Sequence, residues 1–480
     1  MDLRDLLRRT AMQRPAVLAV ALPGATDIRL EVEAEVRRRG WPVAGTPADA
    51  DLMVVCGTPE PRGTEWLDYI ERSMPEPAVR IVIEETGHAA HALEMARRDL
   101  TDRADTPRQA NTDDQQEVAA GDPRDRAQGE HRGHGGDHGH GAHHGSSPPP
   151  APDDQGHPHH SMGHGHDDHA AHPGHEGHEN HHPDDHAPHM DHAEHESHSG
   201  HMNHMGHIGH DMHAMGEVAG LPMAERGDDR DELRLDQLHV PIGPGLTDWP
   251  TGLVLRLTLQ GDVVQDVEVD HLPVTSGHRL PFWDEPWLRA AQGEEVTRGS
   301  AARRRCAAHL DSVGRLFAVV GLDDVAGRCR RLRDELLSGT PREGVGGDLG
   351  RVLRRVRRSR TLRWSIAGLG KLSSSRAGEA GVTGPALVAD GDAYDRLRIW
   401  LDEIERGLEV LDDERPLTRD EFTGPRGRLD GPQPPSQALL DILPELLTGT
   451  EFACARIIVA SLDPDIEELA LTPVTGAAHA

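Results

Sequence analysis

The stretch "DLMVVCGTPEPRGTEWLDYIERSMPEPAVRIVIE", residues 51–84, decides the fold of the first part of the chain. Two short apolar runs, "DLMVVCG" and "VRIVIE", enclose "GTEWLDYIERSM", whose apolar residues recur with helical spacing. Short apolar runs on either side of an amphipathic segment indicate buried strands joined by a helix. We therefore predict a strand, a helix and a second strand, with Thr64 capping the helix and Pro75 ending it.

The residues before this stretch repeat the same pattern. The run "AVLAVAL" predicts another strand, and "DIRLEVEAEVRRRG" predicts a helix that Asp27 caps and Gly40 closes. A last helix is expected near Ala89 to Arg98. Residues 1–100 are therefore predicted to form a small, doubly wound α/β domain.

Residues 101–232 have a different composition. Apolar periodicity disappears, and Asp, Gly, Pro, Gln, Arg and then His predominate. Such a composition cannot bury enough apolar surface to repay the entropy of ordering the chain. We interpret these residues as a long, disordered, His-rich linker.

Apolar periodicity returns in residues 233–472. Alternating residues on both sides of Gly261 and Asp262 predict a β-hairpin. Helical spacing follows in "AARRRCAAHLDSVGRLFAVVGL", in "DDVAGRCRRLRDELL" and in "AYDRLRIWLDEIERGLEVL". A further helix is expected over Pro435–Leu447, and "ARIIVASLD" is interpreted as a terminal strand. The prediction is an α-rich α+β domain.

Charge and cysteine content limit the possible partners. The 480 residues include 51 basic and 82 acidic residues, a formal net charge of −31 that repels phosphate backbones, so nucleic acid is not expected as a partner. The four cysteines are scattered without a CxxC pair, which fits a reducing cytoplasm. No apolar segment approaches the roughly 18 residues that span a bilayer. We expect a cytoplasmic protein, peripheral at the cytoplasmic face of the membrane, which it contacts only indirectly through partner subunits.

Two parts of the sequence resemble subunits of known redox complexes. Residues 48–84, with "ADLMVVCGT" followed by "MPEP", resemble the B-type small subunit of respiratory complex I (NADH-quinone oxidoreductase) and the related nickel-iron hydrogenase small subunits. The segments "LHVPIGP", "GLGKLSSSRAGEAGVTGPAL" and "GDAYDRLRIWLDEIERGLEVL" resemble the D-type large subunit of complex I, which is related to the hydrogenase large subunit. The resemblance implies a small-large fusion joined by the linker.

The cofactor ligands of these families are missing from the matching positions. Four cysteines hold a [4Fe–4S] cluster in the small subunits, whereas this chain has "ALPGATD" and "VIEETGHAAHA" at the corresponding places. The C-terminal "DPC" of hydrogenases is replaced by "DPDIEE". The resemblance therefore implies no iron–sulfur cluster, no hydrogenase-type nickel and no catalytic residue. His88 and His91 are interpreted as exposed helix residues, and Cys306 as a buried thiol beside a surface His309.

Histidine is concentrated in the linker. Of 34 histidines, 27 lie between His131 and His213. Spacing by three places them along one side of an extended chain, where neutral imidazoles bind Ni, Zn or Cu ions with low specificity. Because imidazole titrates near pH ~6.5, binding is expected to depend on pH. The predicted ligands are His166, His169, His172, His175, His178, His181, His186, His189, His192, His195, His198, His201, His204, His207, His210 and His213.

These observations favour a non-catalytic structural or accessory subunit of an NADH-quinone-oxidoreductase-like or hydrogenase-like complex, with a metal-binding tract and the other subunits as partners. One alternative is a hydrogenase maturation factor or scaffold that stores nickel. A second alternative is an active NADH-quinone oxidoreductase subunit.

Overall fold

The computed structural model describes residues 12–105, 225–228, 234–274, 280–418 and 421–471. Residues 12–105 and the described residues from 225 onward belong to one compact unit. Within this unit, an α/β part precedes a helical part that contains a small antiparallel sheet. The two parts touch through several side chains, which are described with the site below.

The α/β part contains three parallel strands in the order β1-β2-β3. They are β1 (Val17–Ala21), β2 (Leu52–Cys56) and β3 (Val79–Ile83). All five residues of β2 are buried, as expected for the central strand of a covered sheet. The helices are α2 (Thr26–Arg39), α3 (Pro61–Arg72) and α4 (Ala89–Asp105), with a short η1 (Pro47–Asp49) before β2.

Helices cover both faces of this sheet. Apolar residues of α2 and α4 pack on one face, whereas those of α3 pack on the other. Val43, which follows α2, forms an isolated parallel bridge with Val17 of β1. The chain therefore returns from α2 on the side of β1 away from β2, and this path decides which face each helix covers. The chain leaves β1 toward one edge of the sheet through α2, and it leaves β2 toward the opposite edge through α3. Crossovers of one hand that run in opposite directions place their helices on opposite faces.

The predicted helix ends are correct in part. Gly40 adopts a left-handed conformation, φ 64°, directly after α2 and closes it as predicted. Asp27 does not cap α2, because Ala25 is the capping residue and Asp27 lies in the first turn. Thr64 is not a cap either, since α3 begins at Pro61 and the Thr64 hydroxyl donates to the Glu60 carbonyl, 3.1 Å away. Proline tolerates the first turn of a helix, so this helix starts earlier than the threonine indicates.

The second sheet is antiparallel, in the order β4-β5-β6-β7. It contains β4 (Glu225–Asp228), β5 (Arg234–Ile242), β6 (Leu253–Gln260) and β7 (Val263–His271). The β6-β7 hairpin turns at Gly261, φ 63°, which confirms the predicted hairpin. Strand β4 falls inside the predicted linker; residues 106–224 of that linker lie outside the described part of the chain.

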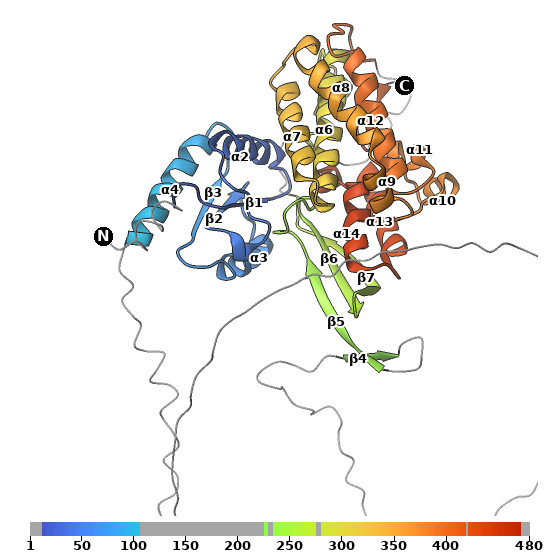
Figure 1. Ribbon diagram of the computed structural model, residues 1–480. Coiled ribbons are helices and arrows are strands. Elements are labelled where there is room, and N and C mark those ends of the chain that lie inside the picture. The colour runs from blue at the N-terminus through green and yellow to red at the C-terminus, as the bar shows by residue number, and fades with distance from the viewer. Residues whose placement is uncertain (1–11, 106–224, 229–233, 275–279, 419–420, 472–480) are drawn as a thin grey trace, which may run out of the picture. The chain divides into compact units, whose positions relative to one another are not determined.

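Helices form most of the remaining structure (Figure 1). Helices α6, α7, α8 and α12 enclose one apolar core, while α13 and α14 pack against β6 and β7 around a second. The helices are α5 (Glu285–Ala291), α6 (Arg298–Val319), α7 (Asp323–Leu337), α8 (Arg342–Arg358), α9 (Arg360–Ile366), α10 (Ser374–Glu379), α11 (Gly384–Ala389), α12 (Ala393–Glu409), α13 (Pro435–Leu447), α14 (Phe452–Leu462) and η4 (Ile466–Ala470).

The predicted terminal strand is wrong. All of the segment "ARIIVASLD" except its last residue belongs to helix α14, and Ala455, Ile458, Val459 and Leu462, which pack in the core around β6 and β7, recur every three or four positions. Its β-branched residues favour a strand in isolation. Packing against α6, α12 and α13 overrides that local preference, because only a helix presents these residues to one core.

Candidate functional site

The carboxyl ends of the three parallel strands open into a pocket of about 400 Å³. Pro23 and Gly24 follow β1, Gly57 follows β2, and Glu84 and Glu85 follow β3. The opposite wall comes from the helical part and includes Leu280, Pro281 and Glu467. Open parallel sheets bind ligands at this end of their strands, so this pocket is the candidate binding site of the α/β part.

Glu467 occupies the amino-terminal end of α2 beside this pocket. One carboxylate oxygen accepts hydrogen bonds from the backbone N–H groups of Gly24 and Thr26, both at 3.1 Å, and from the Thr26 hydroxyl at 2.7 Å. The other oxygen accepts from the Phe282 N–H at 3.1 Å. The helix amides that would attract an anionic ligand are thus occupied by a carboxylate of the chain itself.

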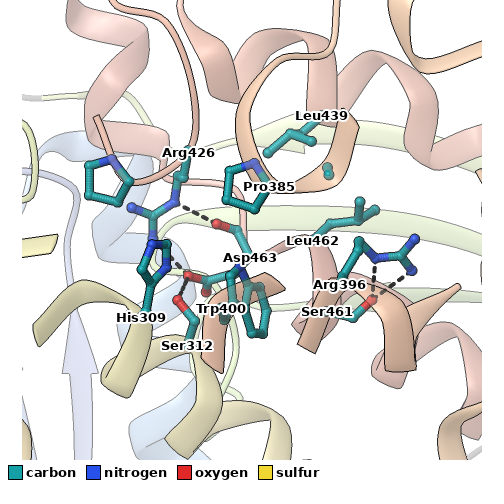
Figure 2. Close-up of a pocket in the computed structure, with 12 residues that line it drawn as sticks. His309, Ser312, Pro385, Arg396, Trp400, Arg426, Leu439, Ser461, Leu462 and Asp463 are labelled. Atoms are coloured by element: carbon teal, nitrogen blue, oxygen red, sulfur yellow. Dashed lines mark hydrogen bonds and ion pairs between the residues drawn. The ribbon is translucent and has the colours of Figure 1, made fainter. Parts of the chain in front are cut away.

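The residues just before Glu467 form a buried ion-pair cluster (Figure 2). One oxygen of Asp463 accepts from the Ser312 hydroxyl at 2.6 Å and from Arg426 at 2.8 Å, and its other oxygen lies 3.1 Å from Arg315. Arg426 also donates to the Asp463 carbonyl at 2.6 Å and lies 3.6 Å from Asp465. Burial lowers the pKa of Arg426, but the surrounding carboxylates outweigh it, so this guanidinium stays charged.

His309 lines a small cavity beside this cluster, together with Trp400 and Arg396 (Figure 2). Its side chain is 2% exposed, so the prediction of a surface histidine is wrong. The residue lies on the inner face of α6, where its Nε2 atom has no hydrogen-bond partner. Burial, followed by nearby arginines, holds the pKa of His309 well below its ordinary value, which leaves the ring neutral.

Two further carboxyl groups are buried nearby with few partners. Asp284 is fully buried, and neither of its carboxyl oxygens has a hydrogen-bond partner. Burial, and then the charges of Glu468 and Asp465, raise the pKa of Asp284 well above its ordinary value. Burial also raises the pKa of Glu468 to about 7. Burial therefore favours the protonated form of both carboxyl groups.

A second network joins α2 to the helical part. Asp311 on α6 accepts from Arg29 at 2.8 Å and from Arg315 at 2.7 Å, and it also pairs with Arg333 of α7. Glu33, one turn after Arg29, lies 2.7 Å from Arg29 and 2.9 Å from Arg333. Burial raises the pKa of Asp311, but its three arginine partners outweigh that effect and hold it well below the ordinary range.

The residues predicted from the sequence are placed as follows. The histidine tract, His166 to His213, lies outside the described residues. His88 and His91 are exposed, the former just before α4 and the latter on it. Across the described ranges, His, Cys, Asp and Glu side chains form no group of three that could hold a metal ion.

The buried cysteines lie in two different cores and do not converge on one site. Cys56 is buried in the core between the sheet and α2, and Cys306 and Cys329 are buried in the helical core. Burial raises the pKa of each of these three thiols to about 12. No cysteine lines the pocket at the strand ends. A [4Fe–4S] cluster needs several converging thiolates, and the described residues offer none at this place.

Sequence reasoning missed the centres of both networks. Asp311 sits in the apolar segment "AAHLDSVGRLF", and Arg333 sits on the buried face of α7. A charged residue at a core position of a predicted helix is a usable signal, because such a charge is buried only when it is paired. Arg426 and Asp284 lie outside the long helices, so the spacing of apolar residues around them gave no indication that they are buried.

Comparisons with known proteins give matches among solved structures only. Neither the protein-family models nor the curated proteins match this sequence. Among solved structures, the fold matches a chain of the membrane-bound sulfane sulfur reductase, an archaeal respiratory membrane complex, with a TM-score of 0.38 and 14% sequence identity. The match covers 48% of this chain and 98% of that chain. None of the helices in the described ranges is both long enough and apolar enough to cross a membrane.

Proposed function

We propose that this protein is a non-catalytic structural or accessory subunit of an NADH-quinone-oxidoreductase-like or hydrogenase-like complex, and that it carries a transition-metal-binding tract. One observation supports the proposal above the others. The loop after β1 and the "DPDIEE" segment are two of the places where the resembling families carry cysteine ligands, and Glu467 bonds them directly to one another. Carboxylate and backbone amides thus meet where those families hold cofactors.

The chemistry of the side chains present supports a scaffold without an iron–sulfur cluster. The strand-end pocket has carboxylates and no thiol, and the adjacent cluster pairs arginines with carboxylates. Guanidinium groups are not metal ligands, and their charge opposes a bound cation. We therefore infer that the α/β part and the helical part, held together by these contacts, bind the partner subunits, and that the chain transfers no electrons itself.

Affinity purification of the tagged full-length chain from detergent extracts tests this proposal. We expect co-purification of subunits of a respiratory or hydrogenase-like complex and no stoichiometric iron or acid-labile sulfide. Iron and sulfide in stoichiometric amounts would overturn the non-catalytic assignment. Recovery of nickel-insertion factors instead of complex subunits would favour the maturation alternative.

Loss of the hydrogen bonds between Glu467 and the amino-terminal end of α2 should lower the amount of partner subunits that co-purifies. Glu467→Ala leaves the N–H groups of Gly24, Thr26 and Phe282 without their acceptor, so we expect their amide hydrogens to exchange at least about tenfold faster, as for a lost buried hydrogen bond. Recovery of partner subunits should fall in parallel. Glu467→Gln keeps one acceptor oxygen for the N–H groups of Gly24 and Thr26 and is the matched control for these two amides, whereas its NH2 group cannot accept from the Phe282 N–H. Unchanged exchange at these three amides would contradict the proposed joining role.

The metal tract is tested separately. We expect the full-length chain to bind several Ni, Zn or Cu ions at about pH 7.5 and to release most of them near pH 5.5, because protonated imidazole cannot ligate. Isothermal titration at the two pH values measures this. Replacing the ten histidines from His186 to His213 that are spaced by three with glutamine should remove much of the capacity. Equal binding at both pH values would exclude histidine as the ligand.

A further inference from the structure

A strongly basic surface runs along α8 and α9. Between Leu349 and Lys371 the sequence contains seven arginines, one lysine and no carboxylate, in a chain whose formal net charge is −31. The bias is local, because acidic residues outnumber basic ones over the whole chain. Helix α8 has 17 residues, and its arginines from Arg351 to Arg358 extend for about 10 Å along it.

The arginines of α8 occupy one side of the helix. Arg351, Arg354, Arg355 and Arg358 are exposed, at spacings of three and four residues. The opposite side buries Val345, Leu349, Val352, Leu353 and Val356 in the helical core. Like charges at these spacings repel one another and destabilise a helix by a few tenths of a kcal/mol per pair. The helix dipole accounts for Arg355 and Arg358 in the last turn of α8, but it does not account for Arg351 and Arg354.

Most of these arginines have no carboxylate partner. Arg357 is neutralised by Asp402 and Glu405 at 2.6 and 2.8 Å, and Arg351 pairs with Asp348. Among the described residues, no carboxylate lies within 4 Å of Arg354, Arg355, Arg358 or Arg360. Four positive charges thus face outward unneutralised. We name Arg354, Arg355, Arg358, Arg360 and Trp364 the α8–α9 face.

Trp364 lies on α9 at one end of this stripe and is 85% exposed, the largest value among the large hydrophobic residues described. Its neighbours Arg360 and Arg363 are also exposed. A solvated tryptophan has no stabilising role in the folded chain, because it leaves a large apolar area in water. An indole flanked by arginines suits the boundary between lipid headgroups and hydrocarbon, where the ring is apolar and its N–H remains wet.

A shallow groove between α7 and α8 extends the basic surface. Arg328, Arg331 and Arg351 line a space of about 340 Å³, together with Glu335 and Asp348. Arg328 and Arg331 are exposed and, within the described ranges, lie within 4 Å of no carboxylate. The groove places guanidinium groups, which match phosphate geometry, beside the end of the stripe.

From these observations we propose that the α8–α9 face binds directly to an anionic phospholipid surface, with its arginines on the headgroup phosphates and Trp364 at the headgroup boundary. The membrane contact would then be direct, which differs from the indirect contact that the sequence favours. A flat lipid surface touches only this face, and at physiological salt the charges on the rest of the chain are screened within about 8 Å. Single-stranded nucleic acid needs several aromatic residues for stacking, and this face offers one.

Vesicle sedimentation of the full-length chain tests the proposal. At about pH 8, where the histidines are neutral, we expect binding to vesicles of phosphatidylcholine with phosphatidylserine and none to phosphatidylcholine alone. Replacing Arg354, Arg355, Arg358 and Arg360 with glutamine should weaken vesicle binding by at least about tenfold. Added salt should also weaken vesicle binding of the wild type. Lipids brominated near the headgroup should quench tryptophan fluorescence, and Trp364→Phe should abolish that quenching.

The matched control removes the same number of positive charges elsewhere. Arg38, Arg98, Arg415 and Arg428 are also exposed, with side chains 62–71% accessible, and their replacement by glutamine should leave vesicle binding unchanged. Equal loss in the two quadruple variants would overturn the proposal, as would binding to neutral vesicles. Binding of RNA or of an acidic polypeptide through the α8–α9 face, without vesicle binding, would overturn it in favour of that other partner.

Discussion

Replacing Asp311 with alanine is expected to lower the free energy of unfolding by about 3–5 kcal/mol, the typical cost of removing one partner from a buried ion pair. Asp311 is buried and bonds Arg29, Arg315 and Arg333. Without it, three guanidinium groups remain in the interior with too few counter-charges. The loss acts on the contact between α2 and the helical part, because Arg29 belongs to α2 and the other two arginines belong to α6 and α7.

Urea unfolding followed by far-ultraviolet circular dichroism measures this effect. Asp430→Ala is the matched control, because Asp430 is an exposed carboxylate that pairs with Arg428, and its loss should change stability by less than about 1 kcal/mol. A change for Asp311→Ala as small as that of the control would show that the network contributes no net stability. Since arginine partners hold the pKa of Asp311 below its ordinary value, its contribution is present at neutral pH and lost on acidification below about pH 4.

The second large effect concerns Glu468 and has the opposite pH dependence. Burial raises the pKa of Glu468 from 4.5 to about 7, so the folded chain holds a proton that the unfolded chain has released. The stability that this proton provides is complete below pH 4.5 and is lost as the pH rises to about 7. At about 1.4 kcal/mol per pH unit, the loss amounts to about 3 kcal/mol.

Glu468→Gln should remove the part of the pH dependence that Glu468 contributes and make the protein more stable than the wild type at about pH 8. The glutamine oxygen can still accept from the Ser436 N–H, which the glutamate accepts at 2.8 Å, and the amide carries no charge to desolvate. Thermal unfolding from about pH 4 to pH 9 measures the profile. Glu409→Gln, at an exposed position on α12, should keep the wild-type profile. Parallel curves for the Glu468→Gln variant and the wild type would contradict the assignment.

The sequence predicted elements wherever burial is periodic. The strands β1, β2 and β3, the β6-β7 hairpin and the long helices α6, α7 and α12 follow directly from apolar spacing. Helix α12 buries Leu397, Trp400, Leu401 and Ile404, which recur at the helical spacing of its sequence, and Leu411 is buried just after its end. Such elements need only their own residues to define which side is apolar. Gly40 was predictable for the same reason, since its left-handed conformation is a local property.

Elements that depend on distant residues were not predictable. The segment that forms α14 has the β-branched composition of a strand, and only its surroundings make it a helix. His309 follows a run of arginines and alanines that looks amphipathic, but the C-terminal segment covers its side of α6. The buried charges are the extreme case, because Glu467 and Thr26 are 441 residues apart and only the folded chain brings them together.

The sequence by itself determined most of the strands and helices, most of their apolar faces, and the concentration of histidine and arginine in separate tracts, because these properties depend on neighbours within a few turns. The tertiary structure alone decided which charges are buried together, that Glu467 closes the end of α2, and that Arg354, Arg355, Arg358 and Arg360 face outward with no carboxylate of the described residues within 4 Å. Ion pairing and burial depend on positions in space, and residues hundreds of positions apart acquire those only when the chain folds.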